Sequence, residues 1–328
     1  MACYLVTGGG GFIGSALVRE ILRRGDQVRV VDNFITGKRE NLHELSGRIE
    51  LHELDITDLD RLAPAFAGVD FVLHQAALPS VPRSVFDPVS SNRNNIDGTL
   101  NVLVASRDAK VKRVVYASSS SAYGDTPILP KRESMMPASI SPYGVTKYVG
   151  ELYASVFTHV YGLETVSLRY FNVFGPRQDP TSPYSGVLSK FITSLLAGKP
   201  PTIFGDGEQS RDFTFVDNVV EANLLACTAP SAAGGVFNIA TGKRYTLNQS
   251  FELLCRMIAK QGATGLTTTL RPVYAPPRPG DIVHSQADID AARERLGYSP
   301  KILFEEGLER TVEWYRTAER ARAETEPA

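Results

Sequence analysis

A glycine-rich turn close to the start of the chain constrains its fold more than any other feature. Gly8, Gly11 and Gly14 follow the spacing G-x-x-G-x-x-G, and an apolar run at 4–7 predicts a strand directly before them. Apolar residues recur at helical spacing directly after them. Such glycines permit a tight turn and let the backbone approach a pyrophosphate, which then faces the free N–H groups and the positive dipole end of the helix. The turn therefore predicts a dinucleotide site with contacts from Gly8, Gly11, Phe12 and Ile13.

Strand-like and helix-like segments alternate through the first half of the chain. We expect strands at 4–7, 27–31, 49–54, 71–74, 114–117 and 166–170, and helices from 12 to Gly25, at 98–108 and at 142–160. Prolines loosen the pattern after Tyr170, before a helix at 216–227 and a strand at 236–240. The alternation predicts an α/β fold: a doubly wound, Rossmann-like parallel sheet with a smaller, interwoven α/β substrate lobe. The dinucleotide-binding domain should comprise residues 1–171 plus about 214–240, and the substrate lobe about 172–213 plus 241–328.

Composition excludes several classes of partner. The net charge of −1 offers no basic field for nucleic acid or for a membrane surface, and the apolar runs are shorter than the roughly 20 residues of a membrane span. The first strand begins so early that a signal peptide has no room, and Cys3, Cys227 and Cys255 form no disulfide or metal pattern. The five histidines show no ligand spacing. We therefore expect a cytoplasmic protein without a bound metal.

Two acidic residues close predicted strands of the dinucleotide-binding half. Asp32 ends the second strand, where a carboxylate can accept hydrogen bonds from both ribose hydroxyls. A carboxylate there repels a 2′-phosphate, which favours NAD over NADP, although Lys38 and Arg39 weaken that preference. The alternative is that Asp32 only shapes the turn. Asp55 and Ile56 end the third strand, where a side chain can meet the adenine.

A second motif supplies the chemistry. Tyr143 and Lys147 lie one helical turn apart on the same face of a predicted helix. Lowering the pKa of a tyrosine from about 10 to about 7 requires roughly 4 kcal/mol, and the charge of Lys147 can supply part of it. Without the glycine turn these residues would indicate only an exposed helix face. With it they indicate a proton acceptor beside a dinucleotide.

The chain resembles the extended short-chain dehydrogenase/reductase family over nearly its whole length. The likeness rests on the glycine spacing, on the Tyr-x-x-x-Lys of Tyr143 and Lys147, and on Asn95 at the start of NIDGT. Within the family it is similar to nucleotide-sugar 4-epimerases, through HQAA at 74–77, SSSSAYG at 118–124, SPYG at 141–144, LRYFNVFG at 168–175, FGDGEQSRDF at 204–213 and RPGD at 278–281. It most resembles bacterial UDP-N-acetylglucosamine 4-epimerases, through LPSVPRS at 78–84, RQDP at 177–180 and DIVHS at 281–285.

This resemblance implies roles for particular residues. Ser119, Tyr143 and Lys147 would be catalytic, with NAD as cofactor. Further cofactor contacts are expected from Asn33, Gln75, Ala76, Ala77, Asn95, Tyr170 and Val173. Contacts with a UDP-sugar are expected from Ser80, Arg83, Ser120, Ser121, Asn172, Val187, Leu188, Arg211, Arg278, Asp281 and Ser285. The family also implies a homodimer through the helices at 98–108 and 142–160.

The predicted reaction interconverts UDP-N-acetylglucosamine and UDP-N-acetylgalactosamine through a transient 4-keto sugar, with UDP-glucose and UDP-galactose as poorer substrates. Ser285 supports this choice, because related epimerases restricted to plain hexoses carry a tyrosine at that position. UDP-glucuronate 4-epimerase is an alternative, which Arg83 and Arg177 keep open. A non-catalytic NAD-binding regulator is a second alternative, but such proteins generally lose the tyrosine or the lysine. A sugar 4,6-dehydratase is disfavoured, since Ser120 and Ser121 stand where those enzymes carry Asp-Glu.

Overall fold

A seven-stranded parallel sheet forms the centre of the molecule. The computed structural model describes residues 1–180, 186–260, 270–277 and 282–325. The strand order across the sheet is β11-β6-β5-β4-β1-β2-β3. The strands are β1 (Cys3–Thr7), β2 (Gln27–Val31), β3 (Glu50–His52), β4 (Phe71–His74), β5 (Arg113–Ser119), β6 (Glu164–Tyr170) and β11 (Val236–Ile239). This arrangement confirms the predicted doubly wound α/β fold.

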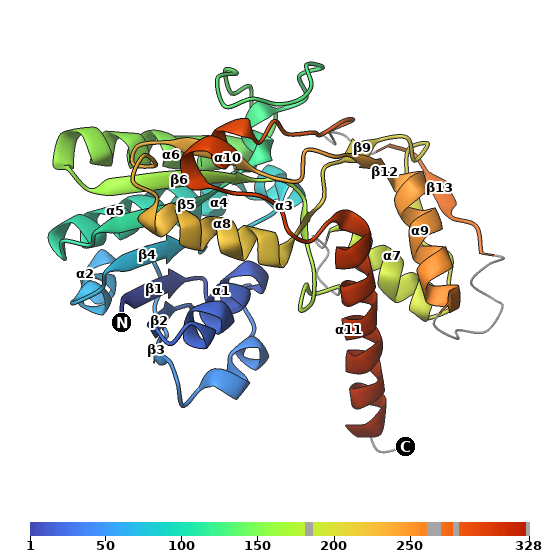
Figure 1. Ribbon diagram of the computed structural model, residues 1–328, viewed down its shortest axis with the longest axis horizontal. Helices are drawn as coiled ribbons and strands as arrows, with labels where there is room; N and C mark the ends of the chain where they lie inside the picture. Colours follow the sequence, from blue (N-terminus) through green and yellow to red (C-terminus); the bar gives the residue numbers. More distant parts are fainter. Residues whose placement is uncertain (181–185, 261–269, 278–281, 326–328) are drawn as a thin grey trace.

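Helices cover both faces of the sheet (Figure 1). On one face lie α1 (Phe12–Arg23) and α8 (Val216–Thr228), and on the other α2 (Leu59–Leu62), α5 (Gly98–Asp108) and α6 (Pro142–Tyr161). Successive side chains of β1 point alternately to the two faces of the sheet. Tyr4 and Val6 belong to the core beneath α1, whereas Leu5 packs with the core beneath α5.

Helices gather in a smaller lobe beyond one end of the strands, at the right of Figure 1. The helices α7 (Val187–Leu196), α9 (Leu247–Lys260) and α11 (Phe304–Thr325) pack against one another. Short ladders accompany them: β7 (Val173–Phe174) with β10 (Thr214–Phe215), β8 (Thr202–Phe204) with β13 (Val273–Ala275), and β9 (Ser210–Arg211) with β12 (Tyr245–Thr246). Aromatic rings fill the contact between this lobe and the sheet, with Phe174 edge-on to Phe215 and Phe304.

One helix of the second half returns to the sheet. The sequence predicts that residues 241–328 belong to the substrate lobe. Within this range, α10 (Asp290–Leu296) packs against β11 and α8, which belong to the dinucleotide-binding half. The boundaries between the two predicted domains stay a prediction. Shorter helical segments fill the connections: α3 (Val81–Phe86), α4 (Pro88–Asn92), a π-helical turn at Arg93–Asp97, and 3-10 turns at Arg39–Asn41, His43–Leu45, Ala63–Phe66 and Ser120–Tyr123.

The topology determines where a crevice opens. The chain runs outward from β1 to β2 and β3, and then returns to place β4 on the other side of β1. The connections after β1 and β4 therefore leave in opposite directions, and a ligand crevice is expected at the carboxyl ends of these two strands.

None of the helices in the described part of the chain has the length and apolar character that a membrane span requires.

Candidate active site

The glycine turn packs backbone directly against backbone. Gly8 has a φ of +70°, and a Cβ at this position would lie 2.7 Å from the backbone nitrogen of Ala76. A Cβ at Gly14 would lie 2.1 Å from the carbonyl oxygen of Gly8. Gly11 is the N-cap of α1, and within the described ranges no side chain caps this helix end. The first N–H groups of α1 are thus left for a ligand, as an anion site at a helix N-terminus requires.

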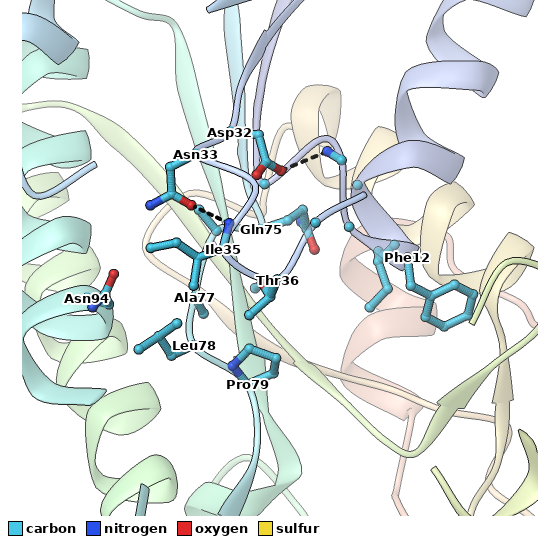
Figure 2. Close-up of a pocket in the computed structure, with 18 of the residues that line it drawn as sticks. Phe12, Asp32, Asn33, Ile35, Thr36, Gln75, Ala77, Leu78, Pro79 and Asn94 are labelled. Atoms are coloured by element: carbon cyan, nitrogen blue, oxygen red, sulfur yellow. Dashed lines mark hydrogen bonds between the residues drawn. The ribbon is translucent and has the colours of Figure 1, made fainter. Parts of the chain in front are cut away.

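A cavity of about 370 Å³ opens in front of this turn. Figure 2 shows Asp32, Asn33, Gln75 and Ala77 around it, with Phe12 on the opposite side. The predicted cofactor residues that line it are Gly8, Gly11, Phe12, Ile13, Asp32, Asn33, Ile56, Gln75, Ala76, Ala77, Tyr143, Lys147 and Tyr170. Sequence reasoning missed other lining residues, among them Ile35, Thr36, Leu78, Pro79 and Asn94, because loop positions carry no periodic signal.

Asp32 both shapes the turn and faces the cavity. One carboxylate oxygen accepts a hydrogen bond from the backbone N–H of Gly10 at 2.8 Å, and the other from Phe34 at 2.7 Å. Burial raises the pKa of Asp32, and these bonds oppose that rise. The two nearby cations are engaged elsewhere, since Lys38 pairs with a carboxylate at 2.8 Å and Arg39 with another at 2.6 Å. The two interpretations of Asp32 are therefore compatible.

These observations allow the fit of NAD to be tested. The turn has no room for a Cβ, the start of α1 is uncapped by side chains of the described residues, and a carboxylate closes β2. Together they match a pyrophosphate and an adenosine ribose without a 2′-phosphate. Of the remaining predicted contacts, Asp55 accepts hydrogen bonds from Thr57 and Asn33 and so supports the cavity wall.

Tyr143 and Lys147 lie in the first turns of α6, where Tyr143 is half-buried and Lys147 is buried. Ser141 caps this helix by accepting a hydrogen bond from the backbone N–H of Gly144 at 3.1 Å, and Pro142 follows the cap. The ammonium of Lys147 donates to the carbonyl oxygen of Ala117 at 2.8 Å and lies 6.0 Å from the centre of the Tyr143 ring. The structure thus brings the two residues together at the cavity wall.

Burial dominates the pKa of Tyr143 in the protein alone. It raises this pKa to about 12, opposed by a hydrogen bond with Ser119, so the charge of Lys147 is not enough to lower it. Burial also lowers the pKa of Lys147 to about 8. Removal from water disfavours the charged form of each group, and this cost outweighs their mutual attraction. The protein alone therefore keeps the phenol protonated.

A chain of hydrogen bonds runs from the wall of the cavity through β1 and β4 to the start of α5. The backbone N–H of Ala76 donates to the hydroxyl of Thr7 at 3.2 Å, which lies 2.7 Å from Nδ1 of His74. Nε2 of His74 lies 2.9 Å from the hydroxyl of Thr99, which donates to the carbonyl of Asn95. Burial lowers the pKa of His74 to about 3, so the ring is neutral. Sequence reasoning missed His74, because a lone histidine at a strand end has no recognisable partner pattern.

Asn95 is buried behind the cavity rather than on its surface. Its Oδ1 accepts from the backbone N–H of Leu78 at 2.7 Å, and its Nδ2 lies 3.1 Å from the hydroxyl of Thr146. That hydroxyl donates to the carbonyl of Tyr143 at 2.8 Å. The predicted cofactor residue Asn95 therefore links the loop after β4 to the catalytic helix.

A second cavity of about 230 Å³ adjoins the first, with Gln178 and Gly186 in both walls. Of the predicted contacts, those that line it are Asn172, Val173, Val187, Leu188 and Arg211. Val173, predicted to touch the cofactor, thus lies on the other cavity. Ser285 is buried, and its Oγ lies 3.5 Å from Nδ2 of Asn172. Arg278 and Asp281 lie outside the described residues.

The remaining predicted substrate residues surround the start of α6. Ser80 has a φ of +111°, a strained value for a residue with a side chain, and its hydroxyl caps α3 by accepting from the backbone N–H of Arg83 at 3.2 Å. Arg83 lines the first cavity. Ser120 and Ser121 begin the 3-10 turn after β5, where the backbone N–H of Ser121 donates to Ser119 at 3.1 Å. No group of three His, Cys, Asp or Glu side chains suited to a metal ion occurs among the residues described.

Several solved structures are similar to the chain over nearly its whole length. The UDP-glucose 4-epimerase of Thermotoga maritima, solved with UDP-glucose, is 41% identical with a TM-score of 0.90, covering 96% of this chain and 99% of its own. The UDP-N-acetylglucosamine 4-epimerase of Methanobrevibacter ruminantium M1, in complex with UDP-N-acetylmuramic acid, is 40% identical with a TM-score of 0.89, covering 97% and 99%. The UDP-glucuronic acid 4-epimerase of Bacillus cereus, in complex with UDP-glucuronic acid and NAD, is 33% identical with a TM-score of 0.86, covering 96% and 99%.

A family model provides an independent comparison. The model described as "NAD dependent epimerase/dehydratase family" matches residues 4–240. That range includes the glycine turn, Asp32 and the pair of Tyr143 and Lys147. The match confirms the predicted cofactor, NAD. The chain belongs to the NAD-dependent epimerase/dehydratase family.

Proposed function

We propose that this NAD-dependent UDP-sugar 4-epimerase interconverts UDP-N-acetylglucosamine and UDP-N-acetylgalactosamine. The observation that carries the chemistry is the pair of Tyr143 and Lys147 at the wall of the cofactor cavity, with Ser119 hydrogen-bonded to Tyr143. The observation that supports the acetylated substrate is the small buried side chain of Ser285 beside Asn172, which lines the second cavity. The first feature serves the oxidation and reduction of carbon 4. The second leaves room for the N-acetyl group of the sugar.

The residues of the chain have distinct tasks in this reaction. Bound NAD supplies an acceptor that takes a hydride from carbon 4 and returns it, and a positive charge next to the phenol. The turn at Gly8 and Gly11 holds the pyrophosphate, and Asp32 accepts from the ribose hydroxyls. Tyr143 removes the proton of the 4-hydroxyl as general base, and Ser119 hydrogen-bonds the same oxygen and shares the proton. Lys147 stabilises the phenolate that results.

The 4-keto sugar must present its other face before the hydride returns. The two adjoining cavities can hold the nucleotide in one and the sugar at their junction. Asn172 and Arg211 would hold the diphosphate, with Val187 and Leu188 near the uracil. Ser120 and Ser121 have short side chains, which leave room for the sugar to turn and can still hydrogen-bond its hydroxyls.

Substitution of Ser285 tests the choice of sugar. The bulk of Ser285→Tyr should exclude the N-acetyl group, because overpacking a pocket costs about 1–3 kcal/mol, or roughly 10-fold or more in discrimination. We expect this variant to lose conversion of the acetylated pair and to keep conversion of UDP-glucose and UDP-galactose. Purified protein is assayed by NMR against UDP-N-acetylglucosamine, UDP-glucose and UDP-glucuronate, with Ser285→Ala as the matched control and Tyr143→Phe as the inactive one. Conversion of the acetylated pair by Ser285→Tyr at the native rate would place the gate elsewhere.

UDP-glucuronate is the second candidate substrate. Arg83 and Arg177 both line the cofactor cavity, where a guanidinium could pair with the carboxylate of this sugar. The same assay decides between the candidates. If UDP-glucuronate is converted faster than both other sugars, the acetylated substrate is wrong.

We also propose that two copies associate through α5 and α6, and that the protein acts in the cytoplasm. Leu152, Val156 and Val160 repeat at intervals of four along α6, and each is 47–66% exposed. Such a stripe fits an apolar contact between helices of two subunits. Cys3, Cys227 and Cys255 are free, which suits a reducing compartment.

A further inference from the structure

The end of β5 is fastened to α6 by successive residues. The hydroxyl of Tyr116 donates to the carbonyl of Lys147 at 3.3 Å, and the carbonyl of Ala117 accepts from the Lys147 ammonium at 2.8 Å. The side chain of Ser118 lies on the same face of β5 as Tyr116, and its hydroxyl donates to the carboxylate of Glu151 on α6. The next residue along β5 is Ser119, so the position of the catalytic serine depends on these attachments.

Glu151 forms a buried ion pair beneath the site. Two nitrogens of Arg169 donate to its carboxylate at 2.8 and 2.6 Å, and both side chains are 3% exposed. Arg169 lies on β6 directly opposite Ser118. Tyr143, Lys147 and Glu151 follow one another at intervals of four residues, on successive turns of one face of α6.

This order creates a competition for the Lys147 ammonium. A carboxylate four residues along a helix attracts an ammonium, and in a buried setting the attraction is screened little. Drawn toward Glu151, the ammonium would leave the carbonyl of Ala117 and stabilise the Tyr143 phenolate less. Arg169 satisfies both oxygens of Glu151 and cancels its charge, which removes the competition.

We propose that Arg169 is a positioning residue, which neutralises Glu151 and so keeps the Lys147 ammonium at the carbonyl of Ala117, available to Tyr143. The proposal rests on the function proposed above. It assigns the buried ion pair a task in proton transfer in addition to its part in packing.

Other titratable groups face this region from every neighbouring element. They are His74 on β4, Tyr116 on β5, Tyr170 on β6, Tyr123 in the 3-10 turn, Arg83 on α3 and Glu133, which neighbours Arg169 and whose pKa is raised by burial. Burial lowers the pKa of His74 to about 3 and raises the pKa of each of the three tyrosines, so these four are neutral near pH 7. Arg83 lines the cavity. His74 and the three tyrosines therefore contribute no change of charge near pH 7 when the pair of Glu151 and Arg169 is altered.

The test follows the acid limb of kcat/KM against pH, which reports the pKa of the essential base in the NAD-loaded enzyme. In Arg169→Met the unpaired carboxylate should move this limb up by about one pH unit, with a roughly 10-fold loss at pH 7 that is recovered at high pH. In Glu151→Gln, which can still accept from Ser118, the unpaired guanidinium should move the limb down. In Arg169→Met/Glu151→Gln the limb should return to its native position.

A matched pair at the opposite end of the same strands controls for packing. Arg113 on β5 donates to Glu164 on β6 at 2.8 Å, and its side chain is 6% exposed. Arg113→Met should lower the melting temperature and leave the limb in place.

If Arg169→Met fails to fold, Glu151→Gln and the double variant still decide. The proposal is overturned if the acid limb of kcat/KM does not move in Glu151→Gln. It is also overturned if the limb of the double variant does not return to its native position. Ultraviolet difference absorbance of the phenolate, native minus Tyr143→Phe, gives the same comparison without turnover. Absence of epimerisation by the native protein would instead refute the proposed function.

Discussion

At the scale of single residues, burial works against the charges that the reaction needs. The pKa of Tyr143 is raised to about 12 and that of Lys147 lowered to about 8, so near pH 7 the phenol is neutral and the lysine only just charged. Each positive charge brought into the cavity lowers the pKa of the phenol. In the proposed reaction, Tyr143 would therefore become a competent base only when NAD fills the site.

Lys147→Met should raise stability while removing activity. Below pH 8 the buried ammonium is charged in both the folded and unfolded chain, and the lowered pKa means that this charge disfavours folding. The penalty fades as the pH rises from about 8 toward the ordinary lysine pKa of about 10.4. After the lost hydrogen bond to Ala117 is deducted, we expect a gain of about 2 kcal/mol in unfolding free energy at pH 7, and none above pH 10. Denaturant unfolding at both pH values checks this. Lower stability at pH 7 would show that the ammonium is well solvated.

Asp32→Ala should relax the choice of cofactor. A carboxylate at the ribose repels a 2′-phosphate, and in this protein Lys38 and Arg39 are held by other carboxylates and do not offset it. The variant should also bind both cofactors more weakly, since Gly10 and Phe34 lose their acceptor. Calorimetric titration with NAD and NADP gives the ratio of the two dissociation constants. If both affinities fall by the same factor, Asp32 only shapes the turn.

At the scale of elements, the glycine turn is the junction on which the cofactor site depends. In Gly14→Ala the new Cβ would lie 2.1 Å from the carbonyl of Gly8, so β1 and α1 must move apart. We expect a loss of at least about 2 kcal/mol of stability and release of NAD. Gly47→Ala is the control, because its Cβ meets nothing within 4 Å, and it should be neutral or slightly stabilising. Thermal unfolding and the NAD content of purified protein measure both effects. Retention of NAD by Gly14→Ala would mean that the turn can widen.

Sequence periodicity predicts the long elements and fails at short ones, for physical reasons. The helix at 98–108 coincides with α5, and the strand at 236–240 differs from β11 by one residue. The strand predicted at 49–54 is shorter because β3 lies at the sheet edge and pairs only with β2. β5 runs on to Ser119 because its last residues pair with β6. Two-residue strands such as β9 and β12 contain too few residues for any period.

Sequence patterns likewise identify some residues of the candidate site and miss others. Motif spacing places Tyr143 and Lys147 correctly on one buried helix face, because four residues of helix fix their relation. It misses His74, which depends on contacts between three separate segments. It also misses the opposing effect of burial on the Tyr143 pKa, since sequence gives the neighbouring charge but not the depth of burial.

At the scale of the whole molecule, α6 has two opposed faces with different tasks. One face holds Tyr143 and Lys147 against the sheet, and the other exposes Leu152 and Val156 at 48% and 47%. Exposed apolar residues at this spacing on a long helix indicate a contact with another helix. Association of two copies at this face would therefore press on the same helix that carries the catalytic pair.

Charge placed at that face tests the proposed dimer. Leu152→Glu/Val156→Glu should convert the protein to a monomer, because two carboxylates would be buried at the interface without partners. We expect the monomer to unfold at a lower temperature, one that no longer depends on protein concentration. Light scattering after size exclusion gives the mass. Val273→Glu, at a 52% exposed position on β13, is the matched control and should leave the mass unchanged. A native protein that is already monomeric would refute the proposed association, whereas a dimer that survives both substitutions would place its interface on another face.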